Sequence, residues 1–273
     1  RKAAQPAVAP SQLSELEGLI RQRVCNILDS LPVGEEFNWV EKVSIELTTQ
    51  MLATLFDYPF EDRHKLPFWS DVATTSDAVG VAGADMEWRM KHLNECLASF
   101  TELWHQRASE PRKFDFISLL AHSEDTKDMV KNPIELLGNL MLLIVGGNDT
   151  TRNSISGGVY FLNKFPEEYD KLRAAPSLIP NMVSEIIRYQ TPLAHMRRVA
   201  TEDTELGGQR IHKGDKVVMW YVSGNRDEEV IDRADEFLID RPNARRHLSF
   251  GFGIHRCMGN RVAEMQLRIL WEE

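Results

Sequence analysis

Cysteine is scarce in this sequence, and long apolar runs are absent from it. The 273 residues include only Cys25, Cys96 and Cys257, an odd number spread far apart, so no disulfide framework or C-x-x-C metal site can be identified. The longest strongly apolar run, Leu140 to Val145, is far too short for a membrane span of about 20 residues. The N-terminus lacks a signal-peptide h-region. We therefore see no membrane anchor and expect a cytoplasmic protein in a reducing compartment.

Positive charge is also in deficit, because the chain carries a formal net charge of −9. An acidic chain without a basic stripe interleaved with aromatic residues is not expected to bind nucleic acid. Within residues 241–263, however, there is no Asp or Glu, and five arginines occur: Arg241, Arg245, Arg246, Arg256 and Arg261. A local basic face on an acidic protein favours electrostatic steering of an acidic partner.

Apolar periodicity along the chain predicts a mainly α fold with small β-sheets. We expect one domain over residues 1–273, since this length can bury a sizeable core. The expected helices run from Pro10 to before Pro32 and over Trp39–Phe56, Ala84–Ala108, Phe116–Ala121, Glu167–Arg173 and Pro180–Tyr189; the expected strands are Leu193–Ala200, Thr204–Leu206 and Lys216–Tyr221. The chain starts without Met and stops inside a further helix predicted from Met258, so we expect an internal fragment.

Cys257 lies in the run Phe250-Gly-Phe-Gly-Ile-His-Arg-Cys-Met-Gly259, just ahead of that helix. A helix N-terminus lowers the pKa of a thiol and favours the metal-ligating thiolate. Gly253 and Gly259 would let the backbone approach a flat metal cofactor closely, and Phe250 would shield the sulfur from water. The alternative is a small buried cysteine in a glycine-rich turn, the usual place of an isolated cysteine.

A long central helix is predicted from a cap at Asn132, with a proline next to it, to Phe165. It contains Gly146-Gly-Asn-Asp-Thr-Thr151, six residues whose summed helix propensity is roughly 4 kcal/mol worse than that of alanine. One interpretation is that the glycines end one helix and a second helix begins. The other is a widened turn, with the Thr150 hydroxyl bonded to the Gly146 carbonyl, that frees groups to hold dioxygen and water.

Glu185 and Arg188 lie three residues apart on one predicted helix face. Such pairs are common on solvated faces and contribute only about 0.2–0.5 kcal/mol. By itself the pair therefore indicates no function.

The spacing F-x-x-G-x-H-x-C-x-G resembles the haem-ligand loop of the cytochrome P450 monooxygenases, in the bacterial form with His two residues before Cys. The resemblance implies the cytochrome P450 fold, truncated at both ends, with haem b bound through Cys257 as the metal ligand. It places His255, Arg198 and Arg1 at the haem propionates, which need paired cations. The other residues it places at the cofactor are Phe250, Gly251, Gly253, Gly259 and Gly147.

Two further motifs fit the same family. The run from Gly146 resembles (Ala/Gly)-Gly-x-(Asp/Glu)-Thr, in which Asp149 would deliver protons and Thr150 would stabilise the activated oxygen. Glu185 and Arg188 resemble the Glu-x-x-Arg element, a structural pair that is buried and closed by a further arginine, here Arg241. Arginine suits such a network because its guanidinium is planar and bidentate.

Residues 143–153 and 191–196, with the cysteine loop, resemble the soluble bacterial alkane hydroxylases of this superfamily. This implies terminal hydroxylation of medium-chain alkanes or related chains, with O2 and with electrons from NADH through ferredoxin reductase and a [2Fe–2S] ferredoxin. The expected apolar pocket comprises Leu142, Val145, Gly146, Leu193, Ala194 and Met196, and the expected face for the redox partner comprises Arg245, Arg246, Arg256 and Arg261.

Two alternatives stay open from the sequence. A peroxide-using fatty-acid peroxygenase of the same fold usually lacks the acid–alcohol pair, so Asp149 and Thr150 argue against it. A non-catalytic haem-binding or gas-sensing protein would be expected to carry a fused output domain, and none is seen in the sequence.

Overall fold

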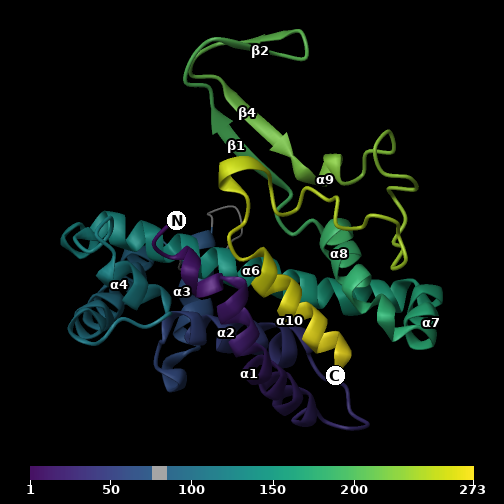
Figure 1. Cartoon of the computed structure of the whole chain (residues 1–273), viewed down its shortest axis with the longest axis horizontal. Helices are drawn as coiled ribbons and strands as arrows, with labels where there is room; N and C mark the ends of the chain where they lie inside the picture. Colours follow the sequence, from purple (N-terminus) through teal and green to yellow (C-terminus); the bar gives the residue numbers. More distant parts are fainter. Residues whose placement is uncertain (76–84) are drawn as a thin grey trace. The chain divides into compact units, whose positions relative to one another are not determined.

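Helices make up most of the chain, with two small antiparallel sheets (Figure 1). The structure, a computed structural model, describes residues 1–75 and 85–273. Its α-helices are α1 (Pro10–Asp29), α2 (Glu46–Phe56), α3 (Lys65–Thr74), α4 (Met86–Ser109), α5 (Phe116–His122), α6 (Pro133–Lys164), α7 (Pro166–Ala174), α8 (Ile179–Gln190), α9 (Tyr221–Gly224) and α10 (Asn260–Glu272); its strands are β1 (His195–Val199), β2 (Thr204–Leu206), β3 (Gln209–Ile211) and β4 (Lys216–Trp220). The prediction of a mainly α fold with small sheets is confirmed.

The packing divides the chain into two units, which are described separately. Unit 1 comprises Arg1–Ser156 and Met258–Glu273, and unit 2 comprises Gly157–Cys257. The expectation of a single domain over residues 1–273 stays a prediction.

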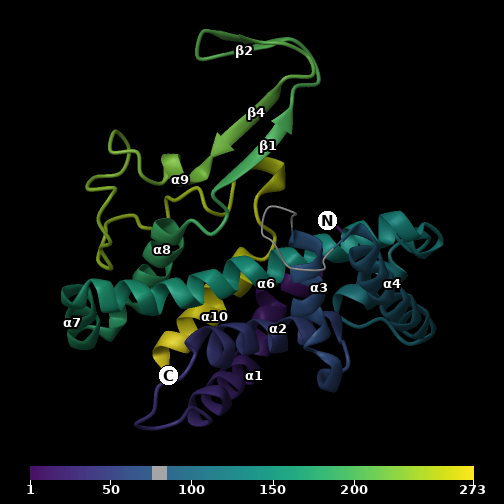
Figure 2. The same cartoon turned by 180° about the vertical axis from the view of Figure 1, so that it is seen from behind.

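In unit 1, α10 packs alongside α1 (Figures 1 and 2), and the Arg268 guanidinium lies 2.9 Å from the Glu17 carboxylate. The helix α1 buries the apolar side of its predicted periodicity, including Leu13 and Ile20. Pro10 occupies its first turn, and the N-cap residue, Ala9, makes no side-chain hydrogen bond.

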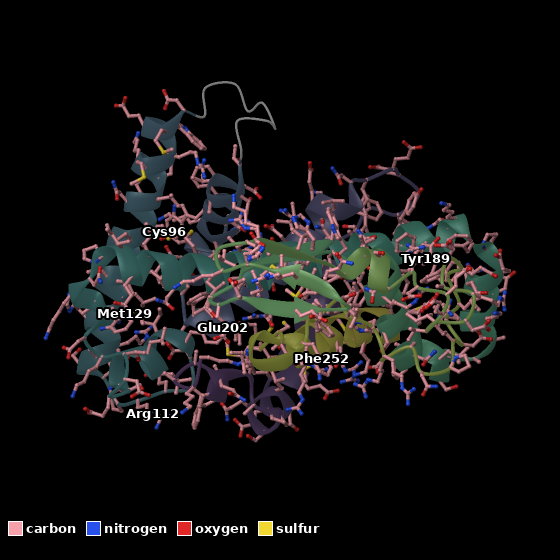
Figure 3. All side chains as sticks on the ribbon, turned by 90° about the horizontal axis from the view of Figure 1, so that it is seen from above. Cys96, Arg112, Met129, Tyr189, Glu202 and Phe252 are labelled. Carbon is pink, nitrogen blue, oxygen red and sulfur yellow. The ribbon has the colours of Figure 1, made fainter. Side chains whose placement is uncertain are left out.

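The core of unit 1 is aromatic where α2, α4 and α5 meet. The Phe56 ring makes edge contacts with Phe100 and Phe116, at centroid distances of 5.2 and 5.3 Å. Cys96, labelled in Figure 3, belongs to α4. It is fully buried, and burial raises the pKa of its thiol. A buried thiol of this kind contributes to packing and is chemically inert.

The central helix α6 is continuous from Pro133 to Lys164. The predicted cap is present, because the backbone N–H of Glu135 donates to Asn132 Oδ1 and the Asn132 amide donates to Glu135 Oε2, both at 3.3 Å. The first of these bonds satisfies one backbone donor that a helix start leaves without a partner, and the second joins the two side chains. The alternative of two helices broken at the glycines is wrong.

Unit 2 is held by an aromatic cluster that links the last turns of α6 to α8. Tyr189 of α8 (Figure 3) contacts Phe161 edge-on, with ring centroids 4.9 Å apart, and Phe237 stacks on Phe165 at 5.9 Å. Such pairs add about 0.5–1.5 kcal/mol each beyond the area that they bury. The cluster therefore anchors α8, which carries the Glu-x-x-Arg residues.

The strands differ from prediction at one place, because β3 was missed. β2 and β3 form a hairpin in which Leu206 is paired with Gln209. Gly207 and Gly208 connect them with φ values of +56° and +76°, as a type I′ turn requires. The Gly-Gly pair between two short strand-like segments could have predicted this hairpin from the sequence.

Two helical segments also differ from prediction. The segment expected as one helix over Trp39–Phe56 consists of a π-helix, Val40–Ile45, followed by α2. The helix α3 was not predicted, because its apolar residues follow no clear period. The expected start of α4 at Ala84 lies outside the described residues.

No helix among residues 1–75 and 85–273 is long and apolar enough to cross a membrane.

Candidate functional site

The segment of residues 248–257, called the Cys257 loop below, folds back on itself in unit 2. The backbone N–H of Cys257 donates to the Phe250 carbonyl at 2.8 Å, and that of Gly251 donates to the Leu248 carbonyl at 2.7 Å. Gly251 and Gly253 have φ values of +69° and +71°, in the left-handed region where side chains are strained. Gly251 has a second reason to lack a side chain, because a Cβ there would lie 3.2 Å from Tyr221 Oη.

The loop presents its thiol on an apolar surface. Cys257 is exposed, Phe252 and Ile254 are 84% and 83% exposed, and no atom lies within 4 Å of where a Gly253 Cβ would stand. The alternative of a small buried cysteine is therefore wrong. The Phe250 ring packs against His247, with ring centroids 5.2 Å apart, and its shielding of the sulfur stays a prediction. The helix after the loop, α10, starts at Asn260 rather than near Met258.

These residues fit a flat apolar group that brings its own metal. Among the described residues, no cluster of three or more His, Cys, Asp or Glu side chains could hold a metal ion. A single cysteine thiolate is the protein ligand that haem iron takes in one class of haem site, and Cys257 could supply it. The exposed Phe252 and Ile254 supply apolar surface beside that thiol.

The expected propionate partners are described unit by unit. In unit 2, Arg198 is half-buried on β1 and donates to the Arg197 carbonyl at 3.0 Å, while His255 is exposed in the Cys257 loop. The β1–β4 register puts Arg198 on the same sheet face as Met196, because they are two residues apart on one strand. In unit 1, Arg1 is exposed.

Glu185, Arg188 and Arg241 are brought together and buried in unit 2, although the first two alone would be expected on a solvated face. Glu185 and Arg188 are 0% and 1% exposed. The Arg188 Nε donates to Glu185 Oε2 at 2.7 Å and its Nη2 donates to Oε1 at 2.8 Å, while Arg241 Nε lies 3.0 Å from Oε2. The remaining guanidinium donors reach backbone carbonyls, including those of Asn225 and Ala234 at 2.7 and 2.8 Å.

A neutral histidine, His247, directly precedes the Cys257 loop. Burial, reinforced by the nearby guanidinium of Arg188, lowers the pKa of His247 to about 4. The neutral ring accepts a hydrogen bond at Nδ1 from the backbone N–H of Ser249, at 3.3 Å. His247 therefore adds no charge beside the thiol at neutral pH.

In unit 1, Asp149 lies in a partly buried polar network on α6. Its Oδ1 accepts from Arg152 at 2.8 Å and from Asn148 at 3.1 Å, and its Oδ2 accepts from Ser70 of α3 at 3.2 Å. Asn148 is fully buried and its Oδ1 accepts from the Thr48 hydroxyl at 3.1 Å. Burial raises the pKa of Asp149, against the opposing effect of Arg152. Ser70 and Thr48 were missed because no local pattern links α2 or α3 to α6.

The expected widened turn is not present, because α6 is α-helical through Gly146–Thr151. The Thr150 hydroxyl does donate to the Gly146 carbonyl, at 3.1 Å. Side-chain bonds to Thr48 and Ser70 offset the poor propensity of this segment without opening it.

The two glycines of this segment face different ways. A Cβ on Gly147 would lie 2.7 Å from Leu52 Cδ2 of α2, whereas a Cβ on Gly146 would meet nothing within 4 Å. Gly147 therefore permits close packing of α6 on α2, which corrects its assignment to the cofactor. Gly146 belongs to the exposed side of α6, which also carries Leu142, 71% exposed.

This difference predicts opposite effects of the same substitution. Gly147→Ala is expected to destabilise the protein by about 1–3 kcal/mol, because Leu52 has to move within a packed core. Gly146→Ala, the matched control, is expected to stabilise it by up to about 1 kcal/mol through helix propensity, while lowering turnover by obstructing the exposed side of α6. Urea denaturation compares the two variants; equal midpoints would contradict the packing role of Gly147.

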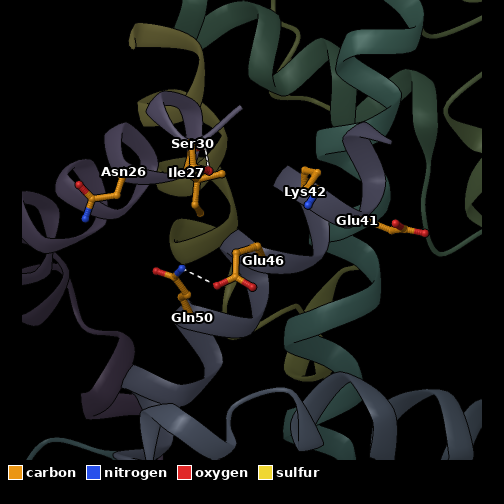
Figure 4. A pocket seen from close by; sticks show the side chains of 7 residues that line it. All are labelled: Asn26, Ile27, Ser30, Glu41, Lys42, Glu46 and Gln50. Carbon is orange, nitrogen blue, oxygen red and sulfur yellow. Dashed lines mark hydrogen bonds between the residues drawn. The ribbon is translucent and has the colours of Figure 1, made fainter. Parts of the chain in front are cut away.

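The remaining pocket residues are also accessible. In unit 1, Val145 is half-buried, and in unit 2, Leu193, Ala194 and Met196 are exposed. A separate pocket of about 410 Å³ in unit 1 shares no residue with this set (Figure 4); it is lined by Asn26, Ile27, Ser30, Glu41, Lys42, Glu46 and Gln50.

The basic residues divide by exposure. Arg245, Arg246 and Arg256 are exposed in unit 2, and Arg261 is exposed in unit 1, whereas Arg241 is buried against Glu185. The basic surface available to a partner is therefore smaller than the run of five arginines suggests.

Comparison with known proteins gives consistent matches along the chain. The family model described as Cytochrome P450 matches residues 2–272. The chain is 40% identical over its whole length to linalool 8-monooxygenase from Pseudomonas putida and spans 66% of that protein. Two solved structures are similar: cytochrome P450-153 from Novosphingobium aromaticivorans (53% identity, TM-score 0.91, 99% of this chain and 65% of that one) and CYP153D17 from Sphingomonas sp. PAMC 26605 (51% identity, TM-score 0.90, 99% and 67%). The chain thus spans about two thirds of these relatives.

Proposed function

Because the chain belongs to the cytochrome P450 family, we propose that its protein is a haem-thiolate monooxygenase acting on an apolar substrate. The observation that carries the proposal is the exposed Cys257 thiol on a glycine-bent loop beside Phe252 and Ile254. The relative named linalool 8-monooxygenase supports the reaction class. In the net reaction, one oxygen atom enters a C–H bond, and two electrons and two protons reduce the other to water.

Haem bound at Cys257 would supply the activation of dioxygen. Cys257 provides the thiolate ligand, and Arg198, His255 and Arg1 are proposed to pair with the two propionates. The half-buried position of Arg198 on β1 favours it for this role, because a charge-assisted hydrogen bond strengthens as water is excluded.

Asp149 is proposed to deliver protons and Thr150 to hold the oxygen that receives them. Burial raises the pKa of the Asp149 carboxyl, so it keeps its proton to higher pH than an ordinary aspartate. Ser70 and Arg152 hold both of its oxygens, so the carboxyl has a fixed starting position. Thr150 can release the Gly146 carbonyl by rotation of its hydroxyl.

Thr150→Ala is expected to preserve haem and substrate binding but to divert electrons to hydrogen peroxide, so product formed per NADH consumed falls severalfold. Thr150→Ser is the matched control, since it keeps a hydroxyl at the same position. Asp149→Asn is expected to slow turnover by on the order of 100-fold, because it removes the transferable proton. Unchanged coupling in Thr150→Ala and efficient turnover with added peroxide would favour the peroxygenase alternative.

For the substrate, we propose medium-chain alkanes or related alkyl chains, hydroxylated at the terminal carbon. The proposed lining is apolar in each unit: Leu142, Val145 and Gly146 from α6, and Leu193, Ala194 and Met196 before and within β1. A terminal methyl is less reactive than the neighbouring methylene, so selectivity has to come from positioning of the chain.

The substrate proposal predicts mainly 1-octanol from octane when the intact protein is supplied with ferredoxin, its reductase and NADH. Leu193→Ala is expected to raise the share of 2-octanol, because it enlarges the space beside the chain. Leu206→Ala, an exposed leucine of β2 outside the proposed lining, is the matched control. Preferred turnover of a bulky polycyclic substrate, or mainly mid-chain alcohols from octane, would reject the alkane proposal.

We further propose that a [2Fe–2S] ferredoxin, reduced by NADH through its reductase, is the electron donor. The exposed Arg245, Arg246 and Arg256 are its proposed contacts in unit 2, with Arg261 in unit 1. Charges of this kind mainly raise the association rate and make it depend on salt.

A further inference from the structure

Asn225 is a fully buried polar residue directly after α9 in unit 2. Its side-chain oxygen accepts from the backbone N–H of Leu248 at 2.7 Å. Its side-chain NH2 donates to the hydroxyls of Thr191 and Ser249, both at 2.9 Å. One amide therefore joins the end of α8 to the first two residues of the Cys257 loop.

The direction of every bond in this cluster is determined. The Thr191 hydroxyl donates to the Arg188 carbonyl at 2.6 Å, and the Ser249 hydroxyl donates to the Ile187 carbonyl at 2.8 Å. Both hydroxyl hydrogens are thus used, and both hydroxyl oxygens can only accept from Asn225. A flipped amide would put its NH2 against the Leu248 N–H, so only one orientation satisfies the cluster.

Two backbone features show how closely these elements approach. Thr191 ends α8 with φ at +42°, a strained conformation for a β-branched residue. A Cβ on Gly224, next to Asn225, would lie 2.6 Å from Leu248 Cδ1. The start of the loop is therefore packed against Gly224 and hydrogen-bonded to Asn225.

The cluster also meets the buried ionic network. Arg188, whose guanidinium pairs with Glu185, donates from Nη1 to the backbone carbonyl of Asn225 at 2.7 Å. At the other side, Ser249 is followed by Phe250, whose carbonyl accepts from the Cys257 N–H. Hydrogen bonds thus connect α8 through Asn225 to Ser249, and the chain itself connects Ser249 to Phe250, whose carbonyl is bonded to the cysteine.

We propose that Asn225 is a positioning residue that fixes the Cys257 loop, and with it the thiol, to the end of α8. The functional reason for fixing the loop rests on the proposed haem-thiolate function, because the thiol has to stay aligned with the metal for the ligand bond to persist. Asn225 itself touches no reacting atom. Without it, Leu248 and the two hydroxyls lose buried partners, and the loop start becomes free to shift.

The structure offers a matched control in Asn181 of α8. Its side-chain NH2 donates to the carbonyls of Ile239 and Arg241, at 2.7 and 3.1 Å. It therefore also ties α8 to a distant segment of unit 2, but it makes no contact with the Cys257 loop. Loss of either amide leaves buried groups unsatisfied, so both substitutions should lower stability, and only Asn225 should affect the loop.

The test compares Asn225→Ala, Ser249→Ala and Asn181→Ala in the intact protein with two measurements. The first is amide hydrogen exchange in peptides covering residues 248–257, which is independent of haem chemistry. Exchange there is expected to be about tenfold faster in Asn225→Ala, the equivalent of one net hydrogen bond, and unchanged in Asn181→Ala. The second is the reduced carbon-monoxide spectrum, in which part of the thiolate band should be replaced by the band of a non-thiolate complex in Asn225→Ala but not in Asn181→Ala.

Ser249→Ala removes one hydrogen bond of the same cluster and is expected to show both changes in weaker form. If Asn225→Ala does not fold, this variant tests the inference in its place. Exchange and spectrum equal to those of Asn181→Ala, at equal haem content, would overturn the inference. If the unmodified protein itself lacks the thiolate band, the proposed function fails, and the exchange measurement still decides whether Asn225 holds the loop.

Discussion

Cys257→Ala is expected to eliminate the strongly red-shifted carbon-monoxide band of the reduced protein and to reduce monooxygenase turnover to background. The reason is that Cys257 is the only side chain in its loop that can supply a thiolate, and no cluster of other metal-binding residues occurs among residues 1–75 and 85–273. The band itself arises from thiolate donation to the iron. Measurement requires a reduced-minus-oxidised comparison in carbon monoxide, at matched protein concentration.

Two other cysteines serve as controls for this prediction. Cys96 is buried in α4 and Cys25 is half-buried in α1, where its thiol bonds to Glu273. Cys25→Ala and Cys96→Ala are expected to keep the band, although Cys96→Ala should lose some stability by leaving a small cavity. Retention of the band in Cys257→Ala would remove the basis of the proposed function.

Glu185→Gln is expected to have the largest effect on stability, a loss of about 3–5 kcal/mol in the free energy of unfolding. It preserves the shape of the side chain but leaves the guanidinium groups of Arg188 and Arg241 without their buried countercharge. The total free energy of unfolding of a protein is typically about 5–15 kcal/mol. A loss of this size should therefore also lower the amount of folded protein obtained at 37 °C. Urea denaturation at fixed pH gives the difference.

Asp170→Asn is the matched control, because Asp170 and Arg173 form a pair in the same unit with the same spacing of three residues. Their closest charged atoms are 3.7 Å apart, and both side chains are exposed. Exposed pairs contribute about 0–1 kcal/mol, so this variant should be nearly neutral. A loss in Glu185→Gln as small as that of Asp170→Asn would contradict the buried-charge interpretation.

The sequence predicted those features of the fold and the site that depend on residues close together in the chain. The spacing of Gly251, Gly253 and Cys257 predicted a bent loop that presents a thiol, because backbone conformation and short-range spacing determine it. The cap at Asn132 was predictable for the same reason. Arg241 was placed next to Glu185 only through the resemblance, since more than fifty residues separate them.

Features set by packing were not predictable from the chain alone. The different orientations of Gly146 and Gly147 become visible only once Leu52 of α2 is in place. Asn225 looks like an ordinary turn residue in the sequence, because its partners are Thr191 and residues 248–249. The widened turn was wrongly expected at Gly146–Thr151, since buried side-chain bonds from α2 and α3 hold that segment in regular helix.

Thr191 has a consequence for engineering this protein. A left-handed backbone at a β-branched residue costs about 1–3 kcal/mol, and stability design would replace it with glycine to recover that energy. The replacement would also delete the hydroxyl that accepts from Asn225. That loss leaves buried groups of Asn225 and Arg188 unsatisfied, which offsets the gain from relieving the backbone. A left-handed φ at position 191 is thus tolerated because the threonine side chain supplies hydrogen bonds that glycine cannot replace.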